Sequence, residues 1–220
     1  MKHDIVFFED SHEYLLDGVI TVPSVTTILG VITNFEYKGI NSSVLEQAAK
    51  RGSLVHEYCQ LYDYEILPEE DEYGIYGYIK AYADFVRDYR CKWEQIEAPV
   101  YSSMGFAGTL DRAGLVEGKQ AIVDIKTIAN PTKMNKFVVC MQTSAYAIAR
   151  AETFGTQTLK RYAVYLKENG EYSVLDCAEY ELKYGVNSSK IFCECTNVYY
   201  IISMLKDAKP IKKGGRNAEV

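Results

Sequence analysis

The sequence predicts an α/β or α+β fold in which a central mixed sheet is flanked by helices. Three strand-like runs, at 93–102, 105–116 and 119–127, follow one another in the middle of the chain. Apolar residues spaced three and four apart, as in amphipathic helices, occur before, between and after such runs. The chain has 220 residues, of which 48% are hydrophobic and 25% charged, which suits a globular protein with a sizeable core.

Short strands and a long helix are expected before the sheet. Residues 5–22 contain two strand-like runs around turns, and 23–29 has the pattern of a short helix with Pro23 in its first turn. Asn41 or Ser42 is the expected N-cap of the long helix, because short polar side chains accept hydrogen bonds from the first turn.

The other elements follow from the same patterns. Helices are expected over about 42–62, 73–91, 134–152 and 184–206. Strands at 158–167 and 171–176 should pair as a hairpin around Asn169-Gly170.

These elements fit one domain with a basic tail. We expect the domain to span 1–206 and the tail 207–220. Within the domain we distinguish N-terminal strands with a short helix, a helical segment, a central core and a C-terminal helix, at 1–40, 41–92, 93–180 and 181–206.

Composition and charge restrict the function. The net charge of −6 argues against a protein that coats nucleic acid non-specifically, although a local basic groove remains compatible with it. No apolar run is long enough to cross a bilayer, so no membrane partner is expected. The N-terminal stretch resembles neither a secretory signal nor a transit peptide, which favours a cytoplasmic protein with free thiols.

Two carboxylates and a lysine occupy strand-like runs that are otherwise apolar. If Glu117-Gly118 centres a hairpin turn, Asp111 falls directly opposite Asp124, with Cβ atoms about 5 Å apart. Like charges in such a pair are destabilising, and a divalent cation between them would reverse the penalty. Hard cations such as Mg²⁺ or Mn²⁺ prefer these oxygen ligands. Lys126 lies on the same face and would hold a phosphate oxygen or help to deprotonate a water molecule.

Two other interpretations of the hairpin are open. The two aspartates are ordinary solvated residues if this face of the hairpin is exposed, although the run "AIVDIKT" is apolar for an exposed strand. A register shift of one residue would put Asp111 and Asp124 on opposite faces and remove the metal site.

Four short motifs follow one another along the chain. Two lie on the hairpin strands, "GTLD" at 108–111 and "DIKT" at 124–127. Two lie on expected helices, "KRGSLVHEY" at 50–58 with the pattern G-x-x-x-H and "QTSAYAIA" at 142–149 with the pattern Q-x-x-x-Y. Together these motifs resemble the PD-(D/E)XK nuclease superfamily, in its RecB-like exonuclease branch. Residues 12–29 also resemble a segment found before the core in phage-type members and in the mitochondrial genome maintenance exonuclease.

The resemblance implies a restriction-endonuclease-like core and assigns roles to particular residues. It implies a metal held by His56, Asp111, Asp124 and the backbone carbonyl of Ile125. Asp111, Asp124 and Lys126 would be catalytic, Gln142 and Tyr146 would orient substrate or support the site, and Glu97 is a weaker additional candidate. Iron–sulfur members of the branch carry a cysteine pattern that Cys177, Cys193 and Cys195 do not reproduce, so no cluster is expected.

The expected function is that of a Mg²⁺- or Mn²⁺-dependent DNA exonuclease acting on single strands or ends, in phage-type replication, recombination or repair. DNA is the expected partner, with a recombination or single-strand-binding protein as a second one. Phosphate contacts are expected, from their positions alone, at Arg51, Lys133, Lys136, Lys212 and Lys213. The alternatives are a non-catalytic DNA-binding recombination accessory protein and an endonuclease of the same fold.

Overall fold

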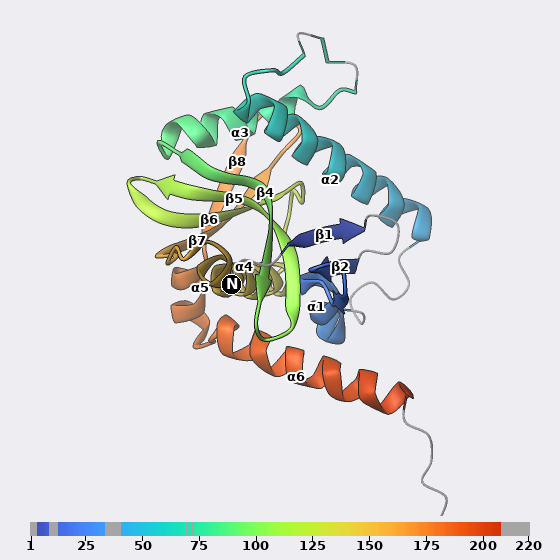
Figure 1. Ribbon diagram of the computed structural model, residues 1–220. Coiled ribbons are helices and arrows are strands. Elements are labelled where there is room, and N and C mark those ends of the chain that lie inside the picture. Colours follow the sequence, from blue (N-terminus) through green and yellow to red (C-terminus); the bar gives the residue numbers. More distant parts are fainter. Residues whose placement is uncertain (1–3, 9–12, 34–40, 69, 72, 208–220) are drawn as a thin grey trace, which may run out of the picture.

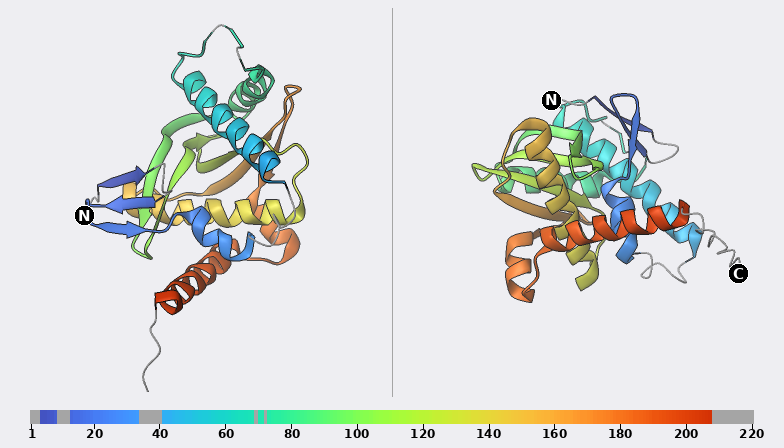
Figure 2. Two further views of the ribbon diagram at one scale, coloured as in Figure 1. Left: turned by 90° about the vertical axis from the view of Figure 1, so that its right-hand side faces the viewer. Right: turned by 60° about the horizontal axis from the view of Figure 1, so that its bottom comes forward.

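The computed structural model has three layers, with a five-stranded sheet between two layers of helices (Figure 1). It describes residues 4–8, 13–33, 41–68, 70–71 and 73–207. Two helices cover one face of the sheet, and the long helix α4 crosses the other face, as the turned view in Figure 2 shows. The predicted α+β class with a central mixed sheet and flanking helices is therefore confirmed.

The central sheet has the strand order β4-β5-β6-β7-β8. Its strands are β4 (Lys92–Ser102), β5 (Phe106–Val116), β6 (Lys119–Lys126), β7 (Lys160–Leu166) and β8 (Tyr172–Asp176). Neighbouring strands are antiparallel except β6 and β7, which are parallel. A parallel pair needs a crossover connection, which α4 (Lys133–Phe154) supplies. The three predicted strands and the hairpin after α4 are all present.

The remaining helices divide between the two faces of the sheet. They are α1 (Val25–Thr33), α2 (Ser42–Asp63), α3 (Tyr76–Asp88), α5 (Cys177–Tyr184) and α6 (Ser188–Asp207). α2 and α3 contribute to the core on one face, whereas α1, α4 and α6 contribute to the core on the other. Asn41 caps α2 as predicted, because its side chain accepts a hydrogen bond from the Ser43 amide at 2.9 Å.

β6 separates these two cores because its side chains alternate. Ala121, Val123 and Ile125 lie in the core under α2 and α3, while Ile122 lies in the core under α1 and α4. This is the alternation predicted from the sequence. It directs Asp124, two residues beyond Ile122, toward the α4 side of the sheet.

The N-terminal region corrects the prediction of two strands and a helix over 23–29. It has three strands, β1 (Ile5–Phe8), β2 (Glu13–Leu16) and β3 (Ile20–Val22), paired in that order as a small antiparallel sheet. α1 begins after Pro23, whose carbonyl instead accepts a hydrogen bond from Ala107 at 3.1 Å.

The predicted helix over 184–206 is present as α6, although it begins at Ser188, and a separate short helix, α5, precedes it without having been predicted. Asp176 ends β8 and caps α5, since its carboxylate accepts hydrogen bonds from the amides of Ala178 and Glu179. Gly185, with φ of +63°, terminates α5 in a left-handed conformation. The predicted tail lies, from residue 208 onward, outside the described residues.

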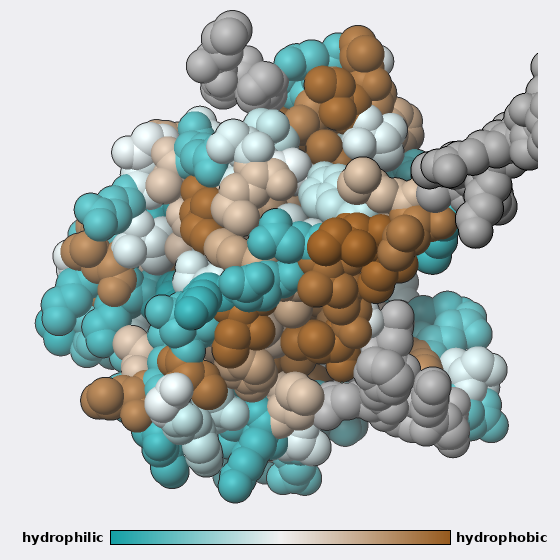
Figure 3. Space-filling view, turned by 90° about the horizontal axis from the view of Figure 1, so that it is seen from below, coloured by the Kyte–Doolittle hydropathy of each residue, from teal (hydrophilic) through white to brown (hydrophobic). Residues whose placement is uncertain are grey.

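The outer half of α6 exposes an apolar stripe on the underside of the molecule, where Figure 3 shows apolar side chains gathered. Val198, Ile201, Ile202 and Leu205 are all exposed and follow the helical spacing of three and four residues. The opposite side of α6 packs against α4 and α1. None of the helices within the described ranges is long and apolar enough to cross a membrane.

Two helical glycines allow a test of the packing of the α2–α3 layer. A Cβ at Gly77 in α3 would lie 1.7 Å from the Glu168 carbonyl oxygen, whereas a Cβ at Gly52 in α2 would meet nothing closer than Thr127 Oγ1 at 3.9 Å. Gly77→Ala should therefore lower the free energy of unfolding by about 1–3 kcal/mol through overpacking. Gly52→Ala, the matched control, should raise it by up to about 1 kcal/mol through helix propensity. Urea denaturation measures both, and equal effects would contradict this packing.

Candidate functional site

The β5–β6 hairpin has the predicted register. Its pairs run from Val116 with Lys119 to Arg112 with Val123, around a turn in which Glu117 and Gly118 both have positive φ. The ladder ends there, although one more step would place Asp111 opposite Asp124. The two strands therefore part where the chain carries its acidic residues.

Where the two strands part, two side chains contact the backbone amide and carbonyl of Ile125. The Ile125 amide donates to Asp111 Oδ2 at 2.6 Å, and the Ile125 carbonyl oxygen lies 3.0 Å from His56 Nε2. The predicted ligands Asp111, His56 and Ile125 O are therefore adjacent. Asp111 is held against β6 by a hydrogen bond to the backbone rather than by a direct pairing with Asp124.

Glu97, the weaker candidate in the sequence, lies opposite Asp111 across β4 and β5. The pairs Ile96 with Arg112 and Ala98 with Leu110 flank this position. Glu97 has φ of +44°, a left-handed conformation that a non-glycine residue adopts at an energetic cost and that often marks functional sites. The opposition of like charges expected between Asp111 and Asp124 thus occurs between Asp111 and Glu97.

His56, Glu97 and Asp111 form a compact group whose candidate ligand atoms all lie within 4.8 Å of one another. His56 Nδ1 is 3.5 Å from Glu97 Oε1 and 3.7 Å from Asp111 Oδ1. Burial alone would lower the pKa of His56, but the carboxylates of Asp111 and Glu97 outweigh burial and raise it to about 9. The group attracts positive charge strongly.

α2 positions His56 by packing its apolar side against the sheet. Val55 and Cys59 are fully buried, and Gly52 lies close enough to Thr127 to bring the helix near the end of β6. The side chain of His56 is 26% exposed. A shallow opening lined by Gly52, Ser53, His56, Glu57, Gln60 and Glu97 connects this group to solvent.

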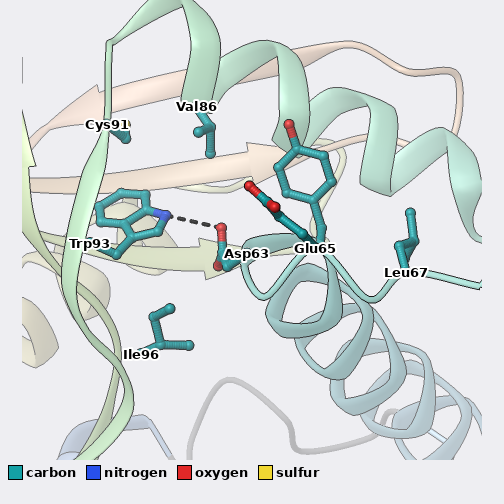
Figure 4. Close-up of a pocket in the computed structure, with 8 residues that line it drawn as sticks. Asp63, Glu65, Leu67, Val86, Cys91, Trp93 and Ile96 are labelled. Atoms are coloured by element: carbon teal, nitrogen blue, oxygen red, sulfur yellow. Dashed lines mark hydrogen bonds between the residues drawn. The ribbon is translucent and has the colours of Figure 1, made fainter.

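A buried arginine, Arg112, forms an ion pair with Glu97. Arg112 Nη1 donates to Glu97 Oε1 at 2.8 Å, and Arg112 Nε donates to Asp63 Oδ2 at 2.6 Å. Asp63 also accepts hydrogen bonds from the Tyr82 hydroxyl and, at 3.1 Å, from Trp93 Nε1. Figure 4 shows the bond from Trp93. The ion pairs with Asp63 and Glu97 hold the pKa of Arg112 above its ordinary value despite burial.

Asp124 and Lys126 form a second part of the site on the α4 side. Asp124 is 1% exposed, and its Oδ2 lies 2.7 Å from Lys126 Nζ. Among the described residues neither carboxylate oxygen has a further hydrogen-bond partner. Burial raises the pKa of Asp124 to about 6, although Lys126 opposes the rise. Asp124 is outside the compact group of His56, Glu97 and Asp111.

Gln142 and Tyr146, predicted from the helix motif in α4, lie together on the same side. Gln142 Nε2 donates to the Tyr146 hydroxyl at 3.2 Å, and both side chains are buried. Gly108 makes room for them, because a Cβ there would lie 2.6 Å from Tyr146 Cε1. Burial, reinforced by Asp111, raises the pKa of Tyr146 well above its ordinary value, so the phenol stays protonated.

The donor set fits a small divalent cation. It combines one imidazole, carboxylate oxygens and a backbone carbonyl, which suit Mg²⁺ or Mn²⁺. The buried carboxylate of Asp124, with Lys126 as its ion-pair partner, lies close enough to Asp111 for the two charges to interact. His56, Glu97 and Asp111 would hold the ion, with Asp124 and Ile125 O as neighbouring oxygen donors.

The other predicted substrate contacts are dispersed. Arg51 is exposed on α2, next to Gly52, which lines the opening at His56. Lys133 and Lys136 line a separate hollow between α4 and α5, beside Tyr180 and Tyr184. Lys212 and Lys213 lie outside the described residues.

Arg112 and Asp63 were not identified from the sequence. Only Asp63 has a spacing in the sequence that could have indicated its place near the site. Asp63 lies seven residues, or two helical turns, after His56, so both side chains are expected on the same face of α2. Arg112 directly follows Asp111 and would be assigned to the opposite face by strict alternation, yet both contact residues of α2.

Comparisons with known proteins add little to this geometry. No family model matches the chain, and no curated protein matches it. Among solved structures, one described as the crystal structure of SSO0001 matches at 12% identity and a TM-score of 0.33, over 80% of this chain and 84% of the other. A likeness at this TM-score carries no argument about fold or function.

Removing the ion pair between Asp63 and Arg112 should destabilise the protein strongly. Asp63→Ala leaves a buried guanidinium with one fewer partner, which should lower the free energy of unfolding by about 3 kcal/mol. Glu46→Ala, in the same helix, breaks an exposed pair with Lys50 and should change it little. Urea denaturation of the two variants compares them, and similar midpoints would contradict the structural role of Asp63.

Glu97 should contribute to cation binding although its sequence signal is weak. Glu97→Gln removes one negative charge from the compact group, so the dissociation constant for Mn²⁺ should rise about tenfold or more. Glu57→Gln is the matched control, because Glu57 lines the same opening outside the group. Isothermal titration with Mn²⁺ alone measures both, and equal losses would mean that general surface charge attracts the ion.

Proposed function

We propose that the protein is a metal-dependent deoxyribonuclease that hydrolyses phosphodiester bonds. It acts as an exonuclease on single strands or DNA ends. The observation that carries the proposal is the compact group of His56, Glu97 and Asp111 next to the buried pair of Asp124 and Lys126. The motif resemblance to RecB-like exonucleases of the PD-(D/E)XK superfamily agrees with this arrangement. A cytoplasmic setting, and a place in replication, recombination or repair, belong to the same proposal.

The first requirement of the reaction is a concentration of negative charge that holds a cation beside DNA. Glu97, Asp111 and Asp124 provide that charge, and His56 provides a nitrogen donor once it is neutral. A bound Mg²⁺ or Mn²⁺ would supply Lewis-acid polarisation of the phosphodiester and of a water molecule. Ile125, whose amide fixes Asp111 and whose carbonyl faces His56, keeps these groups in one place.

The second requirement is positive charge and hydrogen bonding at the phosphate. Lys126 is the cation on the α4 side, and its ion pair with Asp124 fixes where its ammonium lies. From there it can donate to a non-bridging oxygen, whose charge grows in the transition state. Tyr146 and Gln142, joined by a hydrogen bond, present neutral donors beside the carboxylates without adding charge.

Two other functions compete with exonuclease action. A DNA-binding accessory protein would keep the fold without hydrolysis, but a buried carboxylate with an ion-paired lysine next to a cation-binding group is more than binding requires. An endonuclease of the same fold would use the same groups, and the helix motifs that contain His56 and Gln142 favour the exonuclease.

Nuclease assays on defined DNA test the proposal. The protein should degrade end-labelled linear single strands in Mg²⁺ or Mn²⁺, leave circular DNA intact, and lose activity in EDTA. Lys126→Ala should lower kcat about a hundredfold, within the range for groups that act on the transition state, and Asp111→Asn should lower it at least as much.

The matched controls are Lys190→Ala and Glu179→Gln, which alter an exposed lysine and an exposed glutamate outside the site. Both should cut like wild type. Cutting of circular DNA would establish the endonuclease, binding without cutting in every metal would establish the accessory protein, and full activity of Lys126→Ala would refute the assigned site.

A further inference from the structure

A groove between α1 and α4 opens directly beside Lys126. It has a volume of about 370 Å³ and is lined by Leu29 from α1, by Lys126 at the end of β6 and Ile128 beyond it, and by Val138, Val139 and Gln142 from α4, together with threonine and asparagine side chains. Two of these residues, Lys126 and Gln142, belong to the candidate site. A molecule in the groove would therefore be in contact with groups that act on the phosphate.

The groove has the chemistry of a site for a flat, uncharged ring. Leu29, Ile128, Val138 and Val139 provide apolar walls, and threonine and amide side chains provide hydrogen-bonding groups. Lys126 is the one charged residue in its described lining. A nucleobase has two apolar faces and a polar edge, and its attached phosphate needs a cation at the entrance.

The opening on the α2 side has the opposite character. It contains Glu57 and Glu97 beside His56, with Gln60 and Ser53, and so attracts cations and repels phosphate. The site is thus reached by two chemically distinct routes. The acidic route suits a metal ion, and the apolar route with its single lysine suits the nucleotide.

We infer that the groove between α1 and α4 binds one unpaired nucleotide next to the scissile phosphate. This inference rests on the proposed function. A volume of about 370 Å³ is at the low end for small-molecule sites, so it admits one nucleotide and excludes a base pair. A base within a duplex must first leave its stack, which costs least for a strand that is already single. The groove thereby makes the enzyme selective for single strands and frayed ends.

The experiment follows the base directly and does not depend on cleavage. Excess protein in Mg²⁺ is mixed by stopped flow with a short single-stranded oligodeoxynucleotide that carries 2-aminopurine at one of the last positions of either end. Burial of the base should change its fluorescence in the binding phase, before any hydrolysis. The position that responds identifies the nucleotide in the groove.

The variant Ile128→Trp fills the groove from a residue that is 38% exposed, so folding is preserved. The apparent dissociation constant should rise about tenfold, as expected if burial of one base is lost. Ile201→Trp, at a residue 56% exposed on α6, is the matched control and should bind like wild type. Val138→Phe narrows the groove from the opposite wall and should behave like Ile128→Trp.

The outcomes separate this inference from the proposed function. A fluorescence change that Ile128→Trp abolishes, without any cleavage, supports the groove and overturns the nuclease. Cleavage with equal KM in Ile128→Trp and Ile201→Trp, or binding by anisotropy with no response at any 2-aminopurine position, overturns the groove and leaves the nuclease. Equal affinity for a blunt duplex and a single strand also overturns it.

Discussion

Mutual repulsion among buried and partly buried carboxylates is the constraint on which the centre of this structure depends. Asp63, Glu97, Asp111 and Asp124 lie around the point where β5 and β6 part, and their permanent cationic partners are Arg112 and Lys126. Four acids and two such cations leave a net charge of −2 when His56 is neutral. In a medium of low dielectric this excess is costly. Protonation of His56 relieves one charge, and a divalent cation would relieve both.

The sheet creates this constraint by leaving one strand half paired. β6 bonds to β7 along its length to Lys126, but its ladder with β5 ends at Val123. The backbone groups of Ile125 that β5 leaves unpaired are contacted by side chains instead. Its amide donates to Asp111 of β5, and its carbonyl lies beside His56 of α2. A hairpin paired to its end would have closed this edge and left the carboxylates no backbone donor. The site therefore exists because the ladder stops early.

The sequence predicted those features that depend only on the regular repeat of a strand or a helix. The turn at Glu117-Gly118 and the alternation along 119–126 determined the register and the faces of the hairpin, and both are as predicted. The spacing of four residues in the Q-x-x-x-Y motif likewise indicated that Gln142 and Tyr146 are neighbours on one helix face, and they contact each other in α4.

What could not be predicted depends on irregular backbone and on tertiary packing. The pairing of Glu97 with Asp111 requires a shift in register near Trp93 and a positive φ at Glu97, neither of which has a pattern in the sequence. The buried contacts of Arg112 depend on α2 and α3 meeting over the same strand. The groove beside Lys126 forms because α1, a short helix distant in sequence, packs against α4.

Asp124 is the residue at which stability and chemistry oppose each other most clearly. A chain shaped for stability alone would fill this fully covered strand position with a hydrocarbon side chain, as it does at Ile122 and Ile125. Instead the position carries a carboxylate whose pKa burial raises to about 6, with Lys126 as its ion-pair partner. The same lysine lines the groove between α1 and α4, so the ion pair that stabilises Asp124 also fixes a cation at that groove. A carboxylate kept buried at a cost to stability agrees with the proposed function, in which a bound cation would offset that cost.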